Sequence, residues 1–197
     1  MERVLLARHA ESELSVLGLL NGDPRVPCGL TALGKAQAKE LGRSLASEPI
    51  EIAITSDFER CRLTALIALA ERDVQLLELE ALRDIHDGDF DGGPIEDCLE
   101  WAHGAPAIER PPGRGESRVD VARRLAAGLR EVLRRPESTA LVVSHQLPVA
   151  YMLRAARGRN PKAQIEPIPY AYAFALEPKQ LELTVDTLEA WASRPDW

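Results

Sequence analysis

Short apolar runs alternate along the chain with longer stretches in which apolar residues recur at helical spacing. The short runs are rich in leucine and β-branched residues. This alternation predicts an α/β layered fold in which helices cover a mostly parallel sheet. The predicted strands are Arg3–Ala7, Glu51–Thr55, Val74–Leu79, Thr139–Ser144, Ala171–Leu176 and Leu181–Val185.

Three of the longer stretches predict helices with one apolar face. Thr31 and Asp57 are expected to cap the first two through their side-chain oxygens, and Pro136 is expected to stop the third. The residues after Glu177 are expected to form a last strand and a short helix. The predicted helices run from Thr31 to about Ser47, from Asp57 to about Arg72, and from about Arg118 to Arg135.

The segment between Gly88 and Gly115 differs from the rest because six Gly and four Pro interrupt every period. We expect an irregular insertion here. Long stretches without regular structure in compact domains are usually lids or disordered segments, and we interpret this one as a lid over a binding site.

The chain shows no internal repeat, so residues 1–197 are expected to form a single domain.

The charge balance limits the partners that the protein can have. The chain carries 24 Lys and Arg against 31 Asp and Glu, a net charge of −7. This excess argues against sequence-independent binding to nucleic acid or to an anionic membrane, so neither is expected as a partner. Any anionic ligand would therefore need a pocket that is locally positive.

The cysteines and the first residues indicate a reducing, cytoplasmic location. Cys28, Cys61 and Cys98 are odd in number and form no C-x-x-C pair, so neither a disulfide framework nor a zinc knuckle is predicted. The apolar run Val4–Ala7 is too short for a signal peptide or a membrane-spanning helix. Cys61 lies between two arginines near a helix start, which predicts a lowered thiol pKa.

Two cofactor motifs nearly match and fail. Residues 29–36 read G-L-T-A-L-G-K-A, a P-loop without the final Ser or Thr that would hold magnesium. Residues 87–92 read D-G-D-F-D-G, like the opening of a calcium loop, but Cys98 stands where a bidentate Glu is needed. We therefore expect no cofactor and no metal.

Chemically active side chains gather at the predicted strand ends. His9 and His145 each directly follow an apolar run, and two further strands lead on to Arg60 and Asp84. In open α/β sheets, ligands bind outside the carboxyl ends of the strands, so these side chains should project into one crevice. Together with Arg8, they form the set needed to bind a phosphoryl group, attack it and protonate the departing oxygen.

At these residues the chain resembles the histidine phosphatase superfamily, the phosphoglycerate mutase-like proteins. The matching segments keep the family's order and spacing from Arg3 to about Val149, and the resemblance implies a three-layer α/β/α sandwich. They are Arg8-His9-Ala10-Glu11-Ser12, Leu30-Thr31-Ala32-Leu33-Gly34 with Gln37-Ala38, Ser56-Asp57 with Arg60, Leu82-Arg83-Asp84 followed by Gly88 and Gly92, Gly115-Glu116-Ser117, and Ser144-His145.

The resemblance also implies a role for each of the five residues. His9 would be the nucleophile that becomes a phosphohistidine. Arg8, Arg60 and His145 would hold the phosphoryl oxygens and stabilise the charge of the transition state. Asp84 would protonate the leaving alcohol and then help water to attack the phosphoenzyme. None of these steps requires a metal.

The chain departs from the family pattern at several positions. Asp84 stands where many members carry Glu, so the acid reaches less far, and Asp87 or Asp89 remains an alternative. Ser15 replaces a common phosphate-binding Asn, for which Asn21 is a candidate substitute, and Gln146 replaces the usual Gly after the second histidine. The candidate substrate-binding residues are Arg8, Ser15, Asn21, Arg60, His145 and Gln146.

These observations predict a metal-independent phosphomonoesterase that acts on a small phosphorylated metabolite. The short insertion favours hydrolysis, because a mutase must keep its phosphoryl intermediate away from water. Phosphoglycerate mutase activity, phosphohistidine-protein phosphatase activity and a catalytically inactive phosphate-binding scaffold remain alternatives. Association into a homodimer is also left open. Trp101 is expected either to close the lid over an apolar portion of the substrate or to anchor the insertion to the core.

Overall fold

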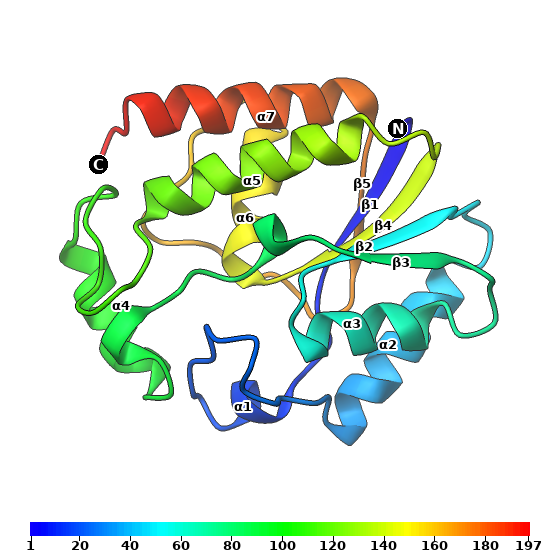
Figure 1. The fold of residues 1–197 in the computed structure, drawn as a ribbon, viewed down its shortest axis with the longest axis horizontal. Helices are drawn as coiled ribbons and strands as arrows, with labels where there is room; N and C mark the ends of the chain where they lie inside the picture. Colours follow the sequence, from blue (N-terminus) through cyan, green and yellow to red (C-terminus); the bar gives the residue numbers. More distant parts are fainter.

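The computed structural model describes residues 1–197 and contains one sheet of five strands. The order across the sheet is β3-β2-β4-β1-β5. β5 pairs with β1 in the antiparallel direction and all other pairs are parallel, so four strands end at the same edge (Figure 1). The strands are β1 (Arg3–Arg8), β2 (Ile52–Thr55), β3 (Gln75–Glu78), β4 (Thr139–Ser144) and β5 (Ala173–Leu176).

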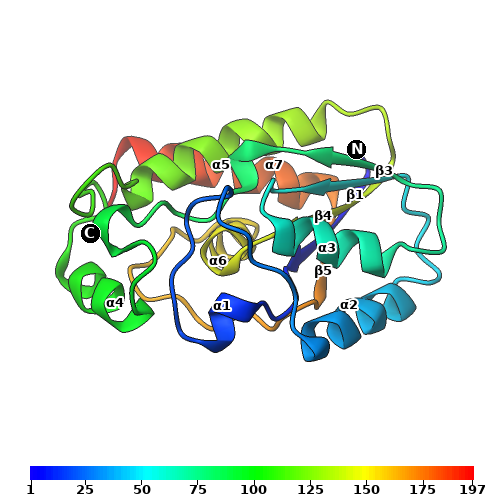
Figure 2. The same cartoon turned by 60° about the horizontal axis from the view of Figure 1, so that its bottom comes forward.

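Helices cover both faces of this sheet. Figure 1 shows α5 and α7 on one side and α2 and α3 on the other, and the turned view in Figure 2 places α4 at the opposite end of the molecule from α2. The α-helices are α1 (Glu13–Val16), α2 (Ala32–Ser44), α3 (Glu59–Ala68), α4 (Ile95–Gly104), α5 (Arg118–Leu133), α6 (Gln146–Ala155) and α7 (Pro178–Ser193). Two short 3-10 helices, η1 (Glu80–Leu82) and η2 (Gly88–Phe90), follow β3.

The alternating side chains of the strands form two cores. In β1, Val4 and Leu6 join the larger core, which includes residues of α5, α6 and α7, whereas Leu5 and Ala7 join a smaller core with residues of α2 and α3. Burying an aliphatic side chain of this size contributes about 1.5–3 kcal/mol. Because the strand is covered on both faces, its sequence is apolar throughout, as expected for a central parallel strand. The prediction of a three-layer α/β fold is confirmed.

The prediction of a strand at Leu181–Val185 is wrong, because these residues lie in the middle of α7. Pro178 occupies the first turn, where proline is tolerated, and Glu177 and Gln180 form a capping box. The local run L-E-L-T-V alternates like a strand, but the buried positions of the whole segment recur at helical spacing. They are Leu181, Thr184, Val185, Leu188, Trp191 and Ala192.

The predicted caps give mixed results. Thr31 accepts a hydrogen bond from the Gly34 amide at 2.9 Å, so the start of α2 is confirmed. Asp57 does not cap α3, which begins at Glu59, because its carboxylate pairs with the Arg83 guanidinium instead. A long-range ion pair has replaced the local cap.

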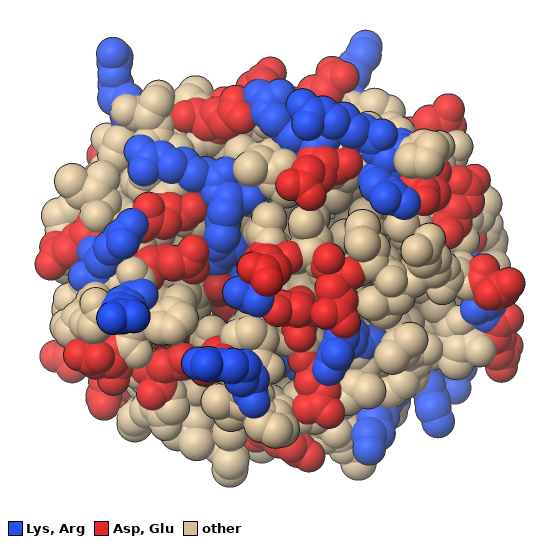
Figure 3. All heavy atoms as spheres, viewed as in Figure 1, with Lys and Arg blue, Asp and Glu red and all other residues tan.

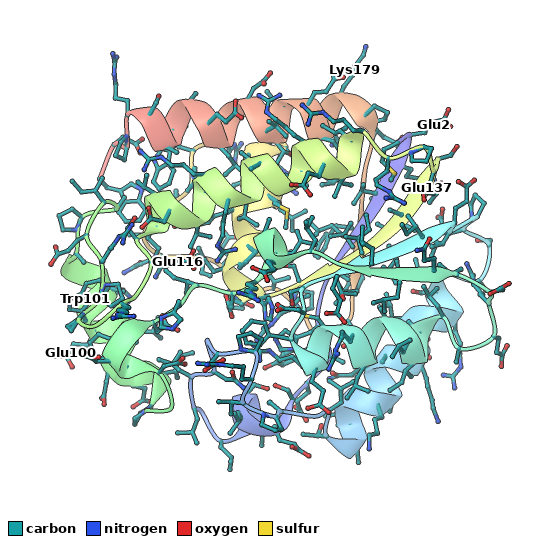
Figure 4. The ribbon with its side chains drawn as sticks, viewed as in Figure 1. Glu2, Glu100, Trp101, Glu116, Glu137 and Lys179 are labelled. Carbon is teal, nitrogen blue, oxygen red and sulfur yellow. The ribbon has the colours of Figure 1, made fainter.

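The insertion between Gly88 and Gly115 is more regular than predicted, since it contains η2 and the ten-residue helix α4. Phe90 and Trp101 pack against each other within it, with ring centroids 5.9 Å apart. Figure 4 shows Trp101 on α4, away from the sheet. Because both rings belong to the insertion, this contact stabilises the insertion internally, and the two expected roles of Trp101 stay predictions.

Two surface properties limit the interactions of the molecule. No helix is both long enough and apolar enough to cross a membrane. Figure 3 shows acidic and basic side chains interspersed over the face that it draws. Positive charge on this face therefore does not gather into one broad patch.

Candidate active site

The two histidines come together because β1 and β4 are neighbours. Arg8 and Ser144, the last residues of these strands, are partners in the parallel register, so His9 and His145 leave the sheet side by side. Their ring centroids lie 5.3 Å apart. Both side chains are buried, at 4% and 0% relative exposure. The sheet register alone thus creates a pair of imidazoles at the carboxyl edge.

His9 is held as a neutral ring with one free nitrogen. Its Nδ1 lies 2.7 Å from the Ala10 carbonyl oxygen, which only accepts hydrogen bonds, so Nδ1 carries the proton and Nε2 keeps its lone pair. Burial, followed by the charges of Arg60 and Arg8, lowers the pKa of His9 well below its usual value. The ring therefore remains a free base at neutral pH.

Arg60 enters the site from the first turn of α3. Its guanidinium donates to His145 Nδ1 and to the Asn21 carbonyl oxygen, both at 3.1 Å, and lies 4.3 Å from the centroid of the Phe58 ring. The Arg60 residue is only 5% exposed, with no carboxylate within ion-pair distance. A buried arginine without an anionic partner is costly, so this cation favours a bound anion.

His145 is fixed in the opposite tautomer. Arginine has no acceptor, so Nδ1 of His145 accepts from Arg60 and Nε2 donates to the Ser56 hydroxyl at 2.7 Å. Burial, then Arg60, lowers the pKa of His145 well below its usual value. His145 is also the N-cap of α6, where the helix dipole favours negative charge.

Arg8 is held by a loop and an aromatic ring. Its guanidinium donates to the Ile168 carbonyl oxygen at 3.0 Å and lies 3.8 Å from the centroid of the Tyr170 ring. The Arg8 Nε is buried without a hydrogen-bond partner. This leaves Arg8 with donor capacity that a bound anion would satisfy.

Asp84 lies beside the histidines, with its Oδ2 3.8 Å from Nδ1 of His145. Arg124 of α5 fixes the backbone here by donating to the carbonyl oxygens of Ala81, Arg83 and Asp84. Arg124 is itself paired with Glu116, which Figure 4 labels at the N-terminal end of α5. Burial raises the pKa of Asp84, although Arg60 and Arg8 oppose the shift. A raised pKa suits a group that must donate a proton.

Neither alternative acid, Asp87 or Asp89, lies within ion-pair distance of a histidine. Asp87 accepts a hydrogen bond from the Cys98 thiol at 3.3 Å, and burial, followed by the charge of Asp84, raises its pKa to about 7. Asp89 is exposed. Of the three carboxyl groups, Asp84 has the position that best suits the general acid.

Comparison with known proteins identifies the family. The model for the histidine phosphatase superfamily (branch 1) matches residues 4–186. The chain belongs to the histidine phosphatase superfamily. It is 31% identical over 169 residues to Phosphoserine phosphatase 1 of Hydrogenobacter thermophilus, covering 80% of this chain and 77% of that protein.

Other relatives carry different activities in their names. The superfamily member named Probable phosphoglycerate mutase GpmB, from Yersinia enterocolitica, is 30% identical over 173 residues, covering 83% of this chain and 79% of that protein. Among solved structures, Bacillus stearothermophilus YhfR superposes with a TM-score of 0.77 at 25% identity, covering 88% and 89% of the two chains. The fold and the family are thus shown, whereas the reaction is not fixed by the relatives.

The remaining predicted binding residues of this histidine phosphatase have structural contacts. The Ser15 hydroxyl donates to the Ser12 carbonyl oxygen at 2.7 Å and caps α1. The Gln146 side chain holds the loop that contacts Arg8, because it accepts from the Ile168 amide and donates to the Glu166 carbonyl oxygen. Asn21 differs, since its side-chain oxygen is buried without a partner. Ser15, Asn21 and Gln146 therefore all remain binding residues only as a prediction.

Sequence reasoning missed one residue of the site and misread another. Tyr170 lies over Arg8 and has its ring centroid 5.9 Å from that of His9. The only signal for it is an aromatic residue just before the predicted strand Ala171–Leu176. The expectation of a lowered thiol pKa at Cys61 is wrong, because complete burial raises that pKa to about 12 despite Arg60. Cys61 is an inert core residue.

Proposed function

We propose that this histidine phosphatase is a metal-independent phosphomonoesterase that transfers the phosphoryl group of a small-molecule ester first to His9 and then to water. One observation carries the proposal. The His9 imidazole is held neutral by a hydrogen bond from Nδ1, so that Nε2 is a nucleophile placed among two arginines and a second histidine. That arrangement is complementary to a phosphoryl group under attack.

In the first step, the His9 Nε2 lone pair forms a bond to phosphorus while the bond from phosphorus to the ester oxygen breaks. Arg8 and Arg60 hold the non-bridging oxygens with fixed donors, and the N-terminus of α6 adds a favourable dipole. Asp84 gives its proton to the departing oxygen, which leaves as the alcohol. The products are the alcohol, the phosphohistidine and the Asp84 carboxylate.

In the second step, water replaces the alcohol. The Asp84 carboxylate accepts a proton from the water as its oxygen bonds to phosphorus, and the bond to Nε2 breaks with its electron pair returning to His9. Both residues regain their starting protonation states and phosphate is released. Asp84 thus acts as acid and then as base.

Access of water favours hydrolysis over mutase chemistry. The Asp84 side chain is 26% exposed, so water reaches the carboxyl group that would activate it. A mutase must retain its phosphohistidine through a change of substrate position. The relatives include proteins named as phosphatases and as phosphoglycerate mutases, and an assay for isomerisation of phosphoglycerate separates the two activities for this chain.

Covalent labelling tests the nucleophile. Brief exposure to a radiolabelled phosphomonoester should label the wild type with an acid-labile, base-stable bond, because a phosphoramidate on histidine has that stability pattern. His9→Ala should remove the label, whereas Arg157→Gln, a change at an exposed site beyond α6, should retain it. Labelling that persists in His9→Ala would reject the mechanism.

Two further measurements separate the alternatives. Hydrolysis of an aryl phosphate distinguishes an enzyme from an inactive scaffold. The chain has no group of three or more His, Cys, Asp and Glu side chains placed to hold a metal ion, so exhaustive chelation should leave turnover intact. Loss of activity on chelation that zinc or magnesium restores would contradict the proposal.

A further inference from the structure

A mostly apolar cavity opens next to Asp84. Its volume is about 470 Å³, and it lies between the insertion helix α4, the start of α6 and the loop around Ile165. Ile95, Leu99 and Leu147 contribute apolar walls. The general acid must lie beside the leaving oxygen, so a cavity that begins at Asp84 is placed to hold the rest of the leaving alcohol.

Arg118 is the only lysine or arginine that lines this cavity, and His103 is its only histidine. Arg118 is partly buried and forms no ion pair with any carboxylate of the chain, although its guanidinium lies within hydrogen-bonding reach of the buried Tyr151 hydroxyl. Its charge acts on Asp87 and Tyr151. Burial raises the pKa of Asp87 to about 7 and that of Tyr151 to about 12, and the positive charge of Arg118 partly offsets both rises. Arg118 also borders a small recess beside Glu109 and Glu116, but Glu116 is committed to Arg124.

The position of Arg118 is unfavourable for the helix that carries it. It is the first residue of α5, where the helix dipole disfavours positive charge. The fold therefore supplies this half-buried guanidinium at a helix N-terminus with no anionic partner. An arginine in such a place has unused capacity for a planar, bidentate contact with an anion.

We infer that this cavity is the leaving-group subsite and that Arg118 binds a carboxylate on the leaving alcohol, so that the substrates are phosphate esters of hydroxy acids with an apolar body. The inference rests on the proposed function, because it takes Asp84 as the acid. One unpaired cation matches one negative charge. A second phosphate would place a dianion close to Asp87 and Asp84, where like charges repel.

A second cavity beside Asp84 is the main rival. It is larger, about 750 Å³, and is lined chiefly by charged residues. Three of its arginines are already neutralised, since Arg25 pairs with Asp23, Arg83 with Asp57 and Arg124 with Glu116. Arg114 has no such partner but is exposed, where water weakens any ion pair. The apolar cavity therefore offers the stronger anion contact.

A matched pair of esters tests the inference. The phosphate ester of ω-hydroxyhexanoate and its methyl ester share a body and a leaving oxygen but differ in one charge. The wild type should prefer the free acid through a lower KM. Arg118→Gln should lower kcat/KM for the acid by roughly 10- to 100-fold and change the methyl ester little, since a hydrogen bond to a charged group is lost only with the acid.

Three variants make the result specific. Arg118→Lys should keep part of the preference, because the charge remains without the planar fork. Arg157→Gln makes the same change in net charge at an exposed site beyond α6 and should keep the full preference for the acid over the methyl ester. Loss of preference in Arg114→Gln but not in Arg118→Gln would overturn the inference in favour of the larger cavity.

Failure of the inference is distinguishable from failure of the proposed function. Equal losses for acid and methyl ester in Arg118→Gln, at an unchanged melting temperature, would show that Arg118 does not recognise the carboxylate, and the phosphatase assignment would stand. If the wild type showed no preference for the acid over the methyl ester, the carboxylate site would likewise be rejected and the phosphatase assignment would stand. Absence of turnover with both esters and with an aryl phosphate would reject the phosphatase function itself.

Discussion

At the scale of single residues, the site combines neutral imidazoles with unpaired arginines. His9 and His145 are fixed in opposite tautomers by hydrogen bonds to groups that can play only one role, a carbonyl oxygen and a guanidinium. The same arginines that would attract a phosphoryl dianion also keep His9 unprotonated. Substrate binding and activation of the nucleophile therefore have a common electrostatic cause.

Replacing Asp84 should separate esters by their leaving groups. In Asp84→Asn, kcat/KM for alkyl phosphates should fall by about 10²–10⁴, and that for aryl phosphates far less, because a phenolate leaves with little protonation. Asp87→Asn should not reproduce this differential loss, since Asp87 is bound to Cys98. Equal losses on both ester classes in Asp84→Asn would place the general acid elsewhere.

The pH dependence gives this experiment a second readout. Asp84 must be protonated to act as the acid, and its pKa is raised, so activity on alkyl esters should fall as pH rises through that pKa. His9 must be unprotonated, and its pKa is depressed, so the acidic limb that it causes should lie below pH 6.5. Asp84→Asn should remove the alkaline limb and leave the acidic limb in place.

At the scale of elements, close packing of α2 against the loop after β1 links stability to the site. Gly34 lies in the first turn of α2, and a Cβ there would be 2.0 Å from the Glu11 carbonyl oxygen, two residues beyond His9. Alanine normally stabilises a helix interior by about 1 kcal/mol relative to glycine. Here the clash is with backbone, which cannot rotate away, so the sign should reverse.

Gly34→Ala should therefore lower the free energy of unfolding by about 1–3 kcal/mol, measured by urea denaturation, and reduce kcat/KM by displacing His9. Gly104→Ala is the matched control, because a Cβ at that position in α4 meets nothing within 4 Å. It should leave both quantities close to those of the wild type. If Gly34→Ala proved as stable as the wild type, the contact between α2 and Glu11 would be looser than described.

The elements also show what sequence alone could supply. β1 and β4 were predictable because strands buried on both faces are apolar throughout, and their ends then located His9 and His145. The segment Leu181–Val185 was misassigned because its helical period emerges only over the whole of α7. The Asp57–Arg83 pair, the Tyr170 contact with Arg8 and the buried Cys61 thiol depend on residues distant in sequence. Local pattern contains no information about such contacts.

At the scale of the whole molecule, an acidic protein contains a locally positive site. The net charge is −7, yet Arg8 and Arg60 converge on the histidines with no carboxylate ion pair to either guanidinium. Burial lets a positive site exist in an acidic protein, because surface charges are screened over about 8 Å by physiological salt whereas buried charges are screened much less. An oxyanion should thus bind here despite the overall repulsion.

Vanadate binding should stabilise the fold through this site. A ligand at one hundred times its Kd adds about 2.7 kcal/mol to the free energy of unfolding, which for a chain of this length raises the melting temperature by roughly 5–10 °C. Arg60→Gln should abolish most of that rise, measured by differential scanning fluorimetry. Arg62→Gln, two residues along α3 in a half-exposed pair with Glu78, changes the net charge equally and should retain it. An undiminished rise in Arg60→Gln would mean that the anion binds away from the two histidines, because no other contact on α3 could replace the buried guanidinium.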